Sequence, residues 1–148
     1  MVGTTHAAVG AALGVTLSVV TPHYTPLTLA LVAGFAALLP DIDQPVSIIG
    51  RRAHVARYMH HRGITHSGIA WMVISFASLI LLPLPVAVAI FVGYGSHLFL
   101  DSLNSTGIPL WYPNKRKFRL AKIKVGGFID HGLALLALME LFAIIALR

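Results

Sequence analysis

The sequence predicts an all-α polytopic membrane protein with about five short or full transmembrane helices, forming a single domain over residues 1–148. Of the 148 residues, 57% are hydrophobic and only 11% are charged, whereas an ordinary soluble domain carries roughly 25% charged residues. Residues 1–40 contain no Asp, Glu, Lys or Arg, and neither do residues 67–100. So few charges cannot cover a water-facing surface, and apolar blocks of this length are typical of paired membrane spans.

Five apolar segments follow one another, and proline, glycine or polar residues separate them. A Thr21-Pro22 step ends the first, Pro40 ends the second, and a proline-rich turn at 82–85 divides the third from the fourth. Several are shorter than the roughly 20 residues of a full crossing. We therefore expect that polar ends extend these helices, or that some segments stop part-way. The segments are 7–20, 27–39, 68–82, 86–100 and 126–147.

Basic residues are concentrated in two loops, 44–64 and 113–125, and the connections at 21–26 and 83–85 carry no formal charge. The positive-inside rule places both basic loops, and with them the N-terminus, in the cytoplasm. The same rule accounts for the net charge of +6, so we expect membrane lipids as partners and no nucleic acid.

The ionisable residues gather at the ends of segments that this topology places on the cytoplasmic side. Such groups at membrane depth are costly, and they usually face a partner or a wet cavity. The orientation argument uses none of these residues, so their convergence is informative. They are His6 at the start of the first segment, Asp41 and Asp43 after the second, His61 and His66 before the third, His97 and Asp101 at the end of the fourth, and Asp130 at the start of the fifth.

This set predicts a site for one or two divalent metal ions. The chain has no cysteine, and His with carboxylate ligands suits Zn first, with Mn or Fe as alternatives. His97 and Asp101 are four residues apart, which places them on one face of a helix. Asp41 and Asp43 would point the same way on an extended backbone. Asp101, or one of that pair, could bridge two metals.

Simpler interpretations exist for each residue taken alone. A histidine at a helix end is often only interfacial, which we prefer for His23, His54 and His60. Thr65 and Ser67 could simply cap the third segment. Glu140 lies near the middle of the last segment, far from the other acids, where a role in helix packing is expected.

Several strings resemble the YdjM-like family of bacterial inner-membrane proteins, which are predicted metal-dependent hydrolases. The resemblance runs from His6 to about Asp130 and implies a multi-pass protein of the inner (cytoplasmic) membrane. One difference is Asp130, where we expect the family to carry Glu. The matching strings are Leu39-Pro40-Asp41-Ile42-Asp43, His61-Arg62-Gly63-Ile64-Thr65-His66-Ser67, Gly93-Tyr94, Ser96-His97 and Asp101.

The order of the candidate ligands is also similar to that of the zinc-dependent phospholipase C and nuclease P1 proteins. Those proteins use an early His, an Asp, a His and a His-x-x-x-Asp helix. The analogy implies that His66, His97 and Asp101, with Asp41 or Asp43, hold one metal. His6 and Asp101 would help to hold a second. A later set of ligands found in that group is absent here.

Together these features predict hydrolysis of a phosphoester on a lipid or lipid-like substrate, at a site facing the cytoplasm. One of Asp41 and Asp43 is the general-base candidate. Arg62 is the candidate phosphate contact, because a guanidinium matches phosphate geometry, although membrane orientation alone could explain it. Two other hypotheses stay open: a small ion or proton transporter that uses the His/Asp cluster, and a structural metal site without catalysis.

Overall fold

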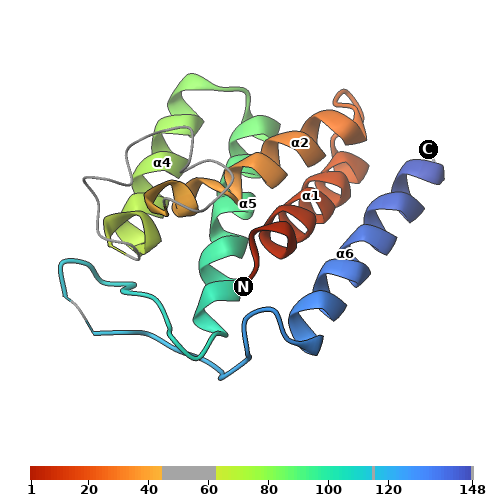
Figure 1. The fold of residues 1–148 in the computed structure, drawn as a ribbon. Coiled ribbons are helices and arrows are strands. Elements are labelled where there is room, and N and C mark those ends of the chain that lie inside the picture. The colour runs from red at the N-terminus through yellow and green to blue at the C-terminus, as the bar shows by residue number, and fades with distance from the viewer. Residues whose placement is uncertain (45–62, 115, 148) are drawn as a thin grey trace.

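The computed structural model describes residues 1–44, 63–114 and 116–147, and within them the chain is helical with no strand. The all-α prediction is confirmed. Five α-helices occur near the five predicted segments, and two short 3₁₀ helices lie between them (Figure 1). In order the elements are α1 Gly3–Val20, α2 Pro26–Ala36, η1 Leu39–Asp43, η3 Ile64–His66, α4 Gly68–Leu81, α5 Leu84–Ser102 and α6 Phe128–Ala146.

Local chemistry explains where several helices begin. Pro26 occupies the first turn of α2, and the Thr25 hydroxyl accepts a hydrogen bond of 3.1 Å from the Thr28 N–H. Ser67 caps α4 in the same way, since its hydroxyl accepts from the Ala70 N–H at 3.2 Å. Each cap satisfies a backbone donor that the helix itself cannot pair.

Four stretches are long and apolar enough to cross a membrane: Gly3–Val20, Pro26–Asp43, Leu84–Ser102 and Phe128–Ala146. The second combines α2 and η1, so the polar end of that segment does extend it. The 14-residue α4 is shorter. The predicted mixture of full and short spans therefore agrees with the structure, and many large apolar side chains on α4 and α6 are exposed, as a lipid-facing surface requires.

Glycines allow α1 and α5 to pack closely against α2. A Cβ atom on Gly14 would collide with the Leu29 carbonyl, and one on Gly93 would collide with the Ala33 carbonyl. A Cβ on Gly10 would lie 2.6 Å from the Ala37 Cβ. Small residues of this kind allow membrane helices to approach through their backbones, and the helix ends that carry the candidate ligands are thereby brought together.

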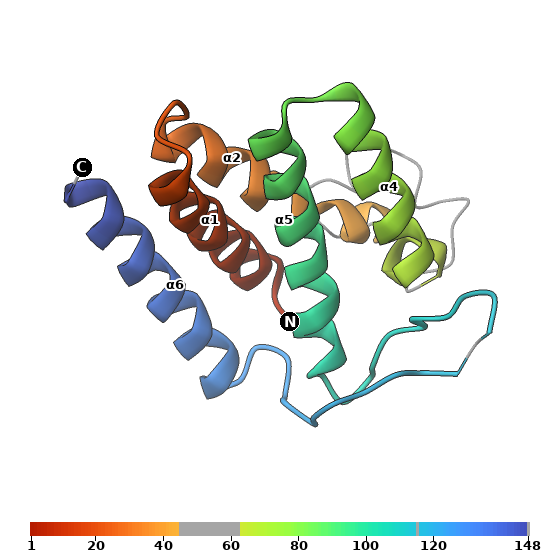
Figure 2. The same ribbon diagram turned by 180° about the vertical axis from the view of Figure 1, so that it is seen from behind.

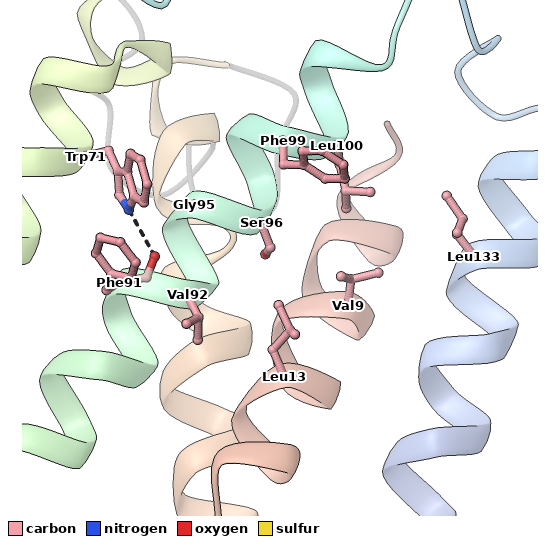
Figure 3. A pocket seen from close by; sticks show the side chains of 10 residues that line it. All are labelled: Val9, Leu13, Trp71, Phe91, Val92, Gly95, Ser96, Phe99, Leu100 and Leu133. Atoms are coloured by element: carbon pink, nitrogen blue, oxygen red, sulfur yellow. Dashed lines mark hydrogen bonds between the residues drawn. The ribbon is translucent and has the colours of Figure 1, made fainter. Parts of the chain in front are cut away.

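Helix α6 packs mainly along α1, on the side away from α4, as the two opposite views show (Figures 1 and 2). An apolar groove of about 500 Å³ lies where α1, α5 and α6 face one another. In Figure 3 Val9 and Leu13 of α1 and Val92 of α5 point into it, and Leu133 of α6 lies opposite.

Candidate metal centre

Three histidines and three aspartates from separate parts of the chain meet at one end of the helix bundle. His6 lies in the first turns of α1, Asp41 and Asp43 lie in η1, and His66 ends η3. His97 and Asp101 lie in the last turns of α5. All six side chains are buried, so each ionisable group needs a partner there.

The two aspartates of η1 lie beside different nitrogens of His66. This corrects the expectation that their side chains point the same way. Pro40 lies in the first turn of a 3₁₀ helix, so the backbone here is not extended. A 3₁₀ helix has three residues per turn, so residues two apart lie on different sides. Asp41 Oδ1 lies 3.5 Å from His66 Nε2 and 3.7 Å from His97 Nε2, whereas Asp43 Oδ2 lies 3.4 Å from His66 Nδ1.

The backbone of α2 fixes the orientation of His97. Its Nδ1 atom lies 2.7 Å from the Ala37 carbonyl oxygen. Because a carbonyl can only accept, Nδ1 carries the proton, and in a neutral ring Nε2 is then left with a lone pair. That Nε2 faces His66 Nε2 at 3.3 Å and Asp101 Oδ2 at 4.0 Å. Metal-binding histidines commonly have this arrangement, with one nitrogen donating to a backbone carbonyl.

His66 is held from its other nitrogen by Asp43, and Thr65 donates to the same carboxylate at 2.8 Å. Burial disfavours the charged imidazole, but hydrogen bonds to Asp41 and Asp43 outweigh it and raise the pKa of His66 to about 9. The same carboxylates that favour a proton here would also favour a metal cation. Tyr94 anchors this segment by donating to the Thr65 carbonyl at 2.6 Å.

Asp101 presents its two oxygens to different histidines. Its Oδ1 lies 3.2 Å from His6 Nε2, and its Oδ2 lies 3.8 Å from His66 Nε2. Asn104 donates to Oδ1 at 2.7 Å, and the amino group of Met1 contacts the same oxygen. The His6 ring stacks on His97 with the centroids 3.8 Å apart, and its buried Nδ1 has no hydrogen-bond partner among the described residues.

These side chains form two groups that could each hold a metal ion. One comprises His6, His97 and Asp101, and the other comprises Asp41, His66 and His97. Within each group one ligand atom per residue lies within 4.8 Å of the others. A buried set of imidazole nitrogens and carboxylate oxygens that face one another fits a divalent transition metal such as Zn.

Other predicted residues lie elsewhere. Asp130 is buried but belongs to neither group: its Oδ2 accepts from the Gly126 N–H at 2.8 Å and the Val2 N–H at 3.0 Å. His61 and Arg62 lie outside the described residues. His23 is exposed, as expected, and Glu140 accepts a hydrogen bond of 2.6 Å from Thr16 on α1, in keeping with a role in helix packing.

Sequence reasoning missed two polar residues that support the site. Asn104 is fully buried beside Asp101, and Gln44 donates to Asp41 Oδ1 at 2.8 Å. Each lies three residues after the aspartate it contacts. A polar side chain one helical turn beyond a candidate ligand could have signalled this role.

Comparison with known proteins identifies the family of this chain. Residues 1–147 match the family described as YdjM inner membrane protein. The chain belongs to the YdjM family. The inner membrane protein YdjM of Escherichia coli K12 is 37% identical over 95 residues, which cover 56% of this chain and 48% of that protein. The Shigella flexneri YdjM protein matches over the same length with the same identity.

A third relative is the uncharacterized protein YvsG of Bacillus subtilis 168, which is 30% identical over 114 residues. That match covers 72% of this chain and 71% of the relative. The chain spans about half the length of the two YdjM proteins it matches. No solved structure matches. Family membership and the spans together make the chain a multi-pass inner membrane protein with a buried His/Asp cluster that could hold a metal.

Proposed function

We propose that this YdjM-family protein is a metal-dependent hydrolase of a phosphoester on a lipid or lipid-like substrate. The observation that carries the proposal is the convergence of three imidazoles and two carboxylates, from four separate elements, into two groups of ligand geometry at one end of the spans. A divalent cation held there would supply Lewis-acid polarisation of a phosphoryl oxygen and activation of water.

We propose one or two ions, and the available atoms limit how the residues can share them. His97 has only Nε2 to offer, because Nδ1 donates to Ala37, so it cannot serve two ions. We propose that Asp41, His66 and His97 hold one ion together with Asp101 Oδ2. His6 and Asp101 would contribute to a second. Zn suits these ligands best, and Mn or Fe are alternatives.

The chain's own residues have distinct tasks in this proposal. Asp43 orients His66 through Nδ1 and is the general-base candidate, whereas Asp41 is a ligand because it faces two Nε2 atoms. Arg62 remains the proposed phosphate contact.

Two features support a lipid-like substrate reached from the cytoplasmic leaflet. The apolar groove beside α5 includes Ser96 and Leu100, so it lies along the same part of α5 that carries His97 and Asp101. The basic loops indicate that the cluster faces the cytoplasm. A cysteine that replaces Lys117 should then react with an impermeant reagent only from the cytoplasmic side; reaction from outside would contradict this orientation.

Substitution of the two η1 aspartates separates catalysis from structural metal binding. Asp41→Asn should lose metal and activity together, because it removes a ligand. Asp43→Asn should keep most of the metal while turnover falls by about 10²–10⁴ if Asp43 is the base, or by about 10–100 if it only orients His66. The measurement is hydrolysis of a panel of lipid phosphomonoesters and phosphodiesters with Zn or Mn, alongside metal content.

His23→Ala is the matched control, since His23 is exposed on the α1–α2 connection, and it should be silent in both assays. Near wild-type hydrolysis by both aspartate variants would overturn the assignment. If wild type hydrolyses no phosphoester, the alternative of a small ion or proton transporter becomes the better account. Glu140→Gln would then be informative, because Glu140 lies far along its span from the cluster, bound to Thr16.

A further inference from the structure

The connection between α5 and α6 forms a long arm, described over residues 104–114 and 116–125, whose base is fixed to the end of α5. Ile108 and Phe118 exchange backbone hydrogen bonds of 3.0 and 2.8 Å. The Leu120 N–H donates to the Ser102 carbonyl at 2.8 Å, and the Ile123 N–H donates to the Leu103 carbonyl at 2.9 Å. Figures 1 and 2 show the arm running along the end of the bundle where α1 begins and α5 ends.

Glycine makes this close pairing feasible. Gly107 has φ of +63°, and a Cβ there would lie 2.7 Å from the Phe118 carbonyl oxygen. Glycine tolerates both conditions. The fold of the arm is therefore defined by specific backbone contacts near its base, and its outer part extends from a fixed point.

The arm exposes large apolar side chains. Trp111 is 71% exposed, Leu120 is 56% exposed and Phe118 is 41% exposed. Tryptophan is enriched where a membrane protein meets the lipid–water interface, because its amphipathic ring is stabilised at the level of the headgroups.

The arm is also strongly basic. The arm contains six Lys and Arg residues, and no Asp or Glu occurs anywhere in 102–129. The side chains of Arg116, Lys117, Lys122 and Lys124 are exposed. Arg119 donates to the Ser105 carbonyl at 2.9 Å and so helps to hold the arm together. No carboxylate within the arm neutralises these charges.

We infer that this arm is a binding surface for the headgroups of anionic phospholipids, in the leaflet on the side of the metal centre. Its exposed aromatic and aliphatic side chains enter the boundary of the acyl chains, and its basic side chains contact lipid phosphates. If the basic residues served only to orient the protein in the membrane, the arm would need neither exposed aromatic residues nor a preference for anionic lipid. The inference does not depend on the proposed hydrolysis.

The two tryptophans of the chain allow a direct test. Trp71 is the other one, with its indole N–H bonded to the Phe91 carbonyl, and Trp71→Phe leaves Trp111 as the sole tryptophan, which can be excited selectively. The protein is reconstituted in phosphatidylcholine vesicles with a minor fraction of phosphatidylglycerol. Bromine, which quenches tryptophan emission, is placed on the acyl chains of the phosphatidylglycerol or of an equal fraction of the phosphatidylcholine.

Brominated phosphatidylglycerol should quench Trp111 more strongly, corresponding to an enrichment of about fivefold or more, as expected for attraction of basic residues to anionic lipid. The excess quenching by brominated phosphatidylglycerol should disappear in a variant carrying Arg116→Gln, Lys117→Gln, Lys122→Gln and Lys124→Gln. The matched control carries Arg116→Lys, Lys117→Arg, Lys122→Arg and Lys124→Arg, and should retain it. Circular dichroism checks that both variants are folded.

Equal quenching by the two brominated lipids would overturn the inference, and so would an excess that persists in the glutamine variant. Binding of a short oligonucleotide that depends on the four basic residues, without any lipid preference, would also overturn it and would assign the arm to nucleic acid instead.

Discussion

At the scale of single residues, sequence spacing predicted which side chains share a face where the residues lie in a regular α-helix. The prediction was wrong where the backbone is not regular. His97 and Asp101 share a face of α5, as a separation of four residues in a helix requires, and both lie in the cluster. Asp41 and Asp43 diverge because the chain after Pro40 forms a 3₁₀ helix. No periodic pattern in the sequence distinguishes that turn from an extended end.

Asp130 shows a second limit of reasoning from sequence. Its position at the start of the last span is where a ligand was expected, yet its carboxylate accepts two backbone N–H groups, from Val2 and Gly126. Contacts between the first residues of α1 and the turn before α6 join distant parts of the chain, and nothing in the local sequence indicates them.

Replacement of Asp130 therefore separates stability from metal binding. Asp130→Ala should lower the free energy of unfolding by about 1–3 kcal/mol, since two hydrogen bonds to a charged acceptor are lost, while metal content per folded chain stays unchanged. Asp130→Asn keeps a carbonyl acceptor, so its free energy of unfolding should lie between those of wild type and Asp130→Ala. Thermal unfolding in detergent and elemental analysis measure the two effects; loss of metal in folded Asp130→Asn would restore Asp130 as a ligand.

At the scale of helices, prolines and apolar runs predicted most boundaries to within a few residues. The largest differences are the start of α1, which begins at Gly3 rather than at residue 7, and the end of α2, which stops at Ala36 rather than at residue 39. Close packing was not predicted, because Gly10, Gly14 and Gly93 face α2 only in the folded arrangement. Those contacts position the ligand-bearing ends.

A glycine-to-alanine pair tests this packing. Gly14→Ala should lower the unfolding temperature, because its methyl group would collide with the Leu29 backbone and separate α1 from α2; overpacking typically costs about 1–3 kcal/mol. Gly132→Ala in α6 is the control, since nothing lies within 4 Å of an added Cβ there. It should be neutral or slightly stabilising. Equal unfolding temperatures for the two variants would argue against tight α1–α2 packing.

At the scale of the whole molecule, composition alone was sufficient for the membrane class and the all-α fold. The charge pattern placed the ionisable residues at one end of the spans, and the structure brings six of the eight site residues expected there into one cluster. Of the other two, Asp130 lies apart and His61 lies outside the described residues. The contact partners of each atom could not be predicted from the sequence, because they depend on contacts between η1, η3 and α5. The different roles proposed for Asp41 and Asp43 depend on the same contacts.

The central claim is that this cluster binds a divalent metal, and elemental analysis of the purified protein tests it most directly. Wild type, loaded with Zn and then freed of excess metal, should retain one or two equivalents per chain. His97→Ala should lose most of that metal while remaining helical, because each ligand lost weakens the site, and His23→Ala should match wild type. Wild type that retains no metal, or folded His97→Ala that retains the full wild-type content, would contradict the account.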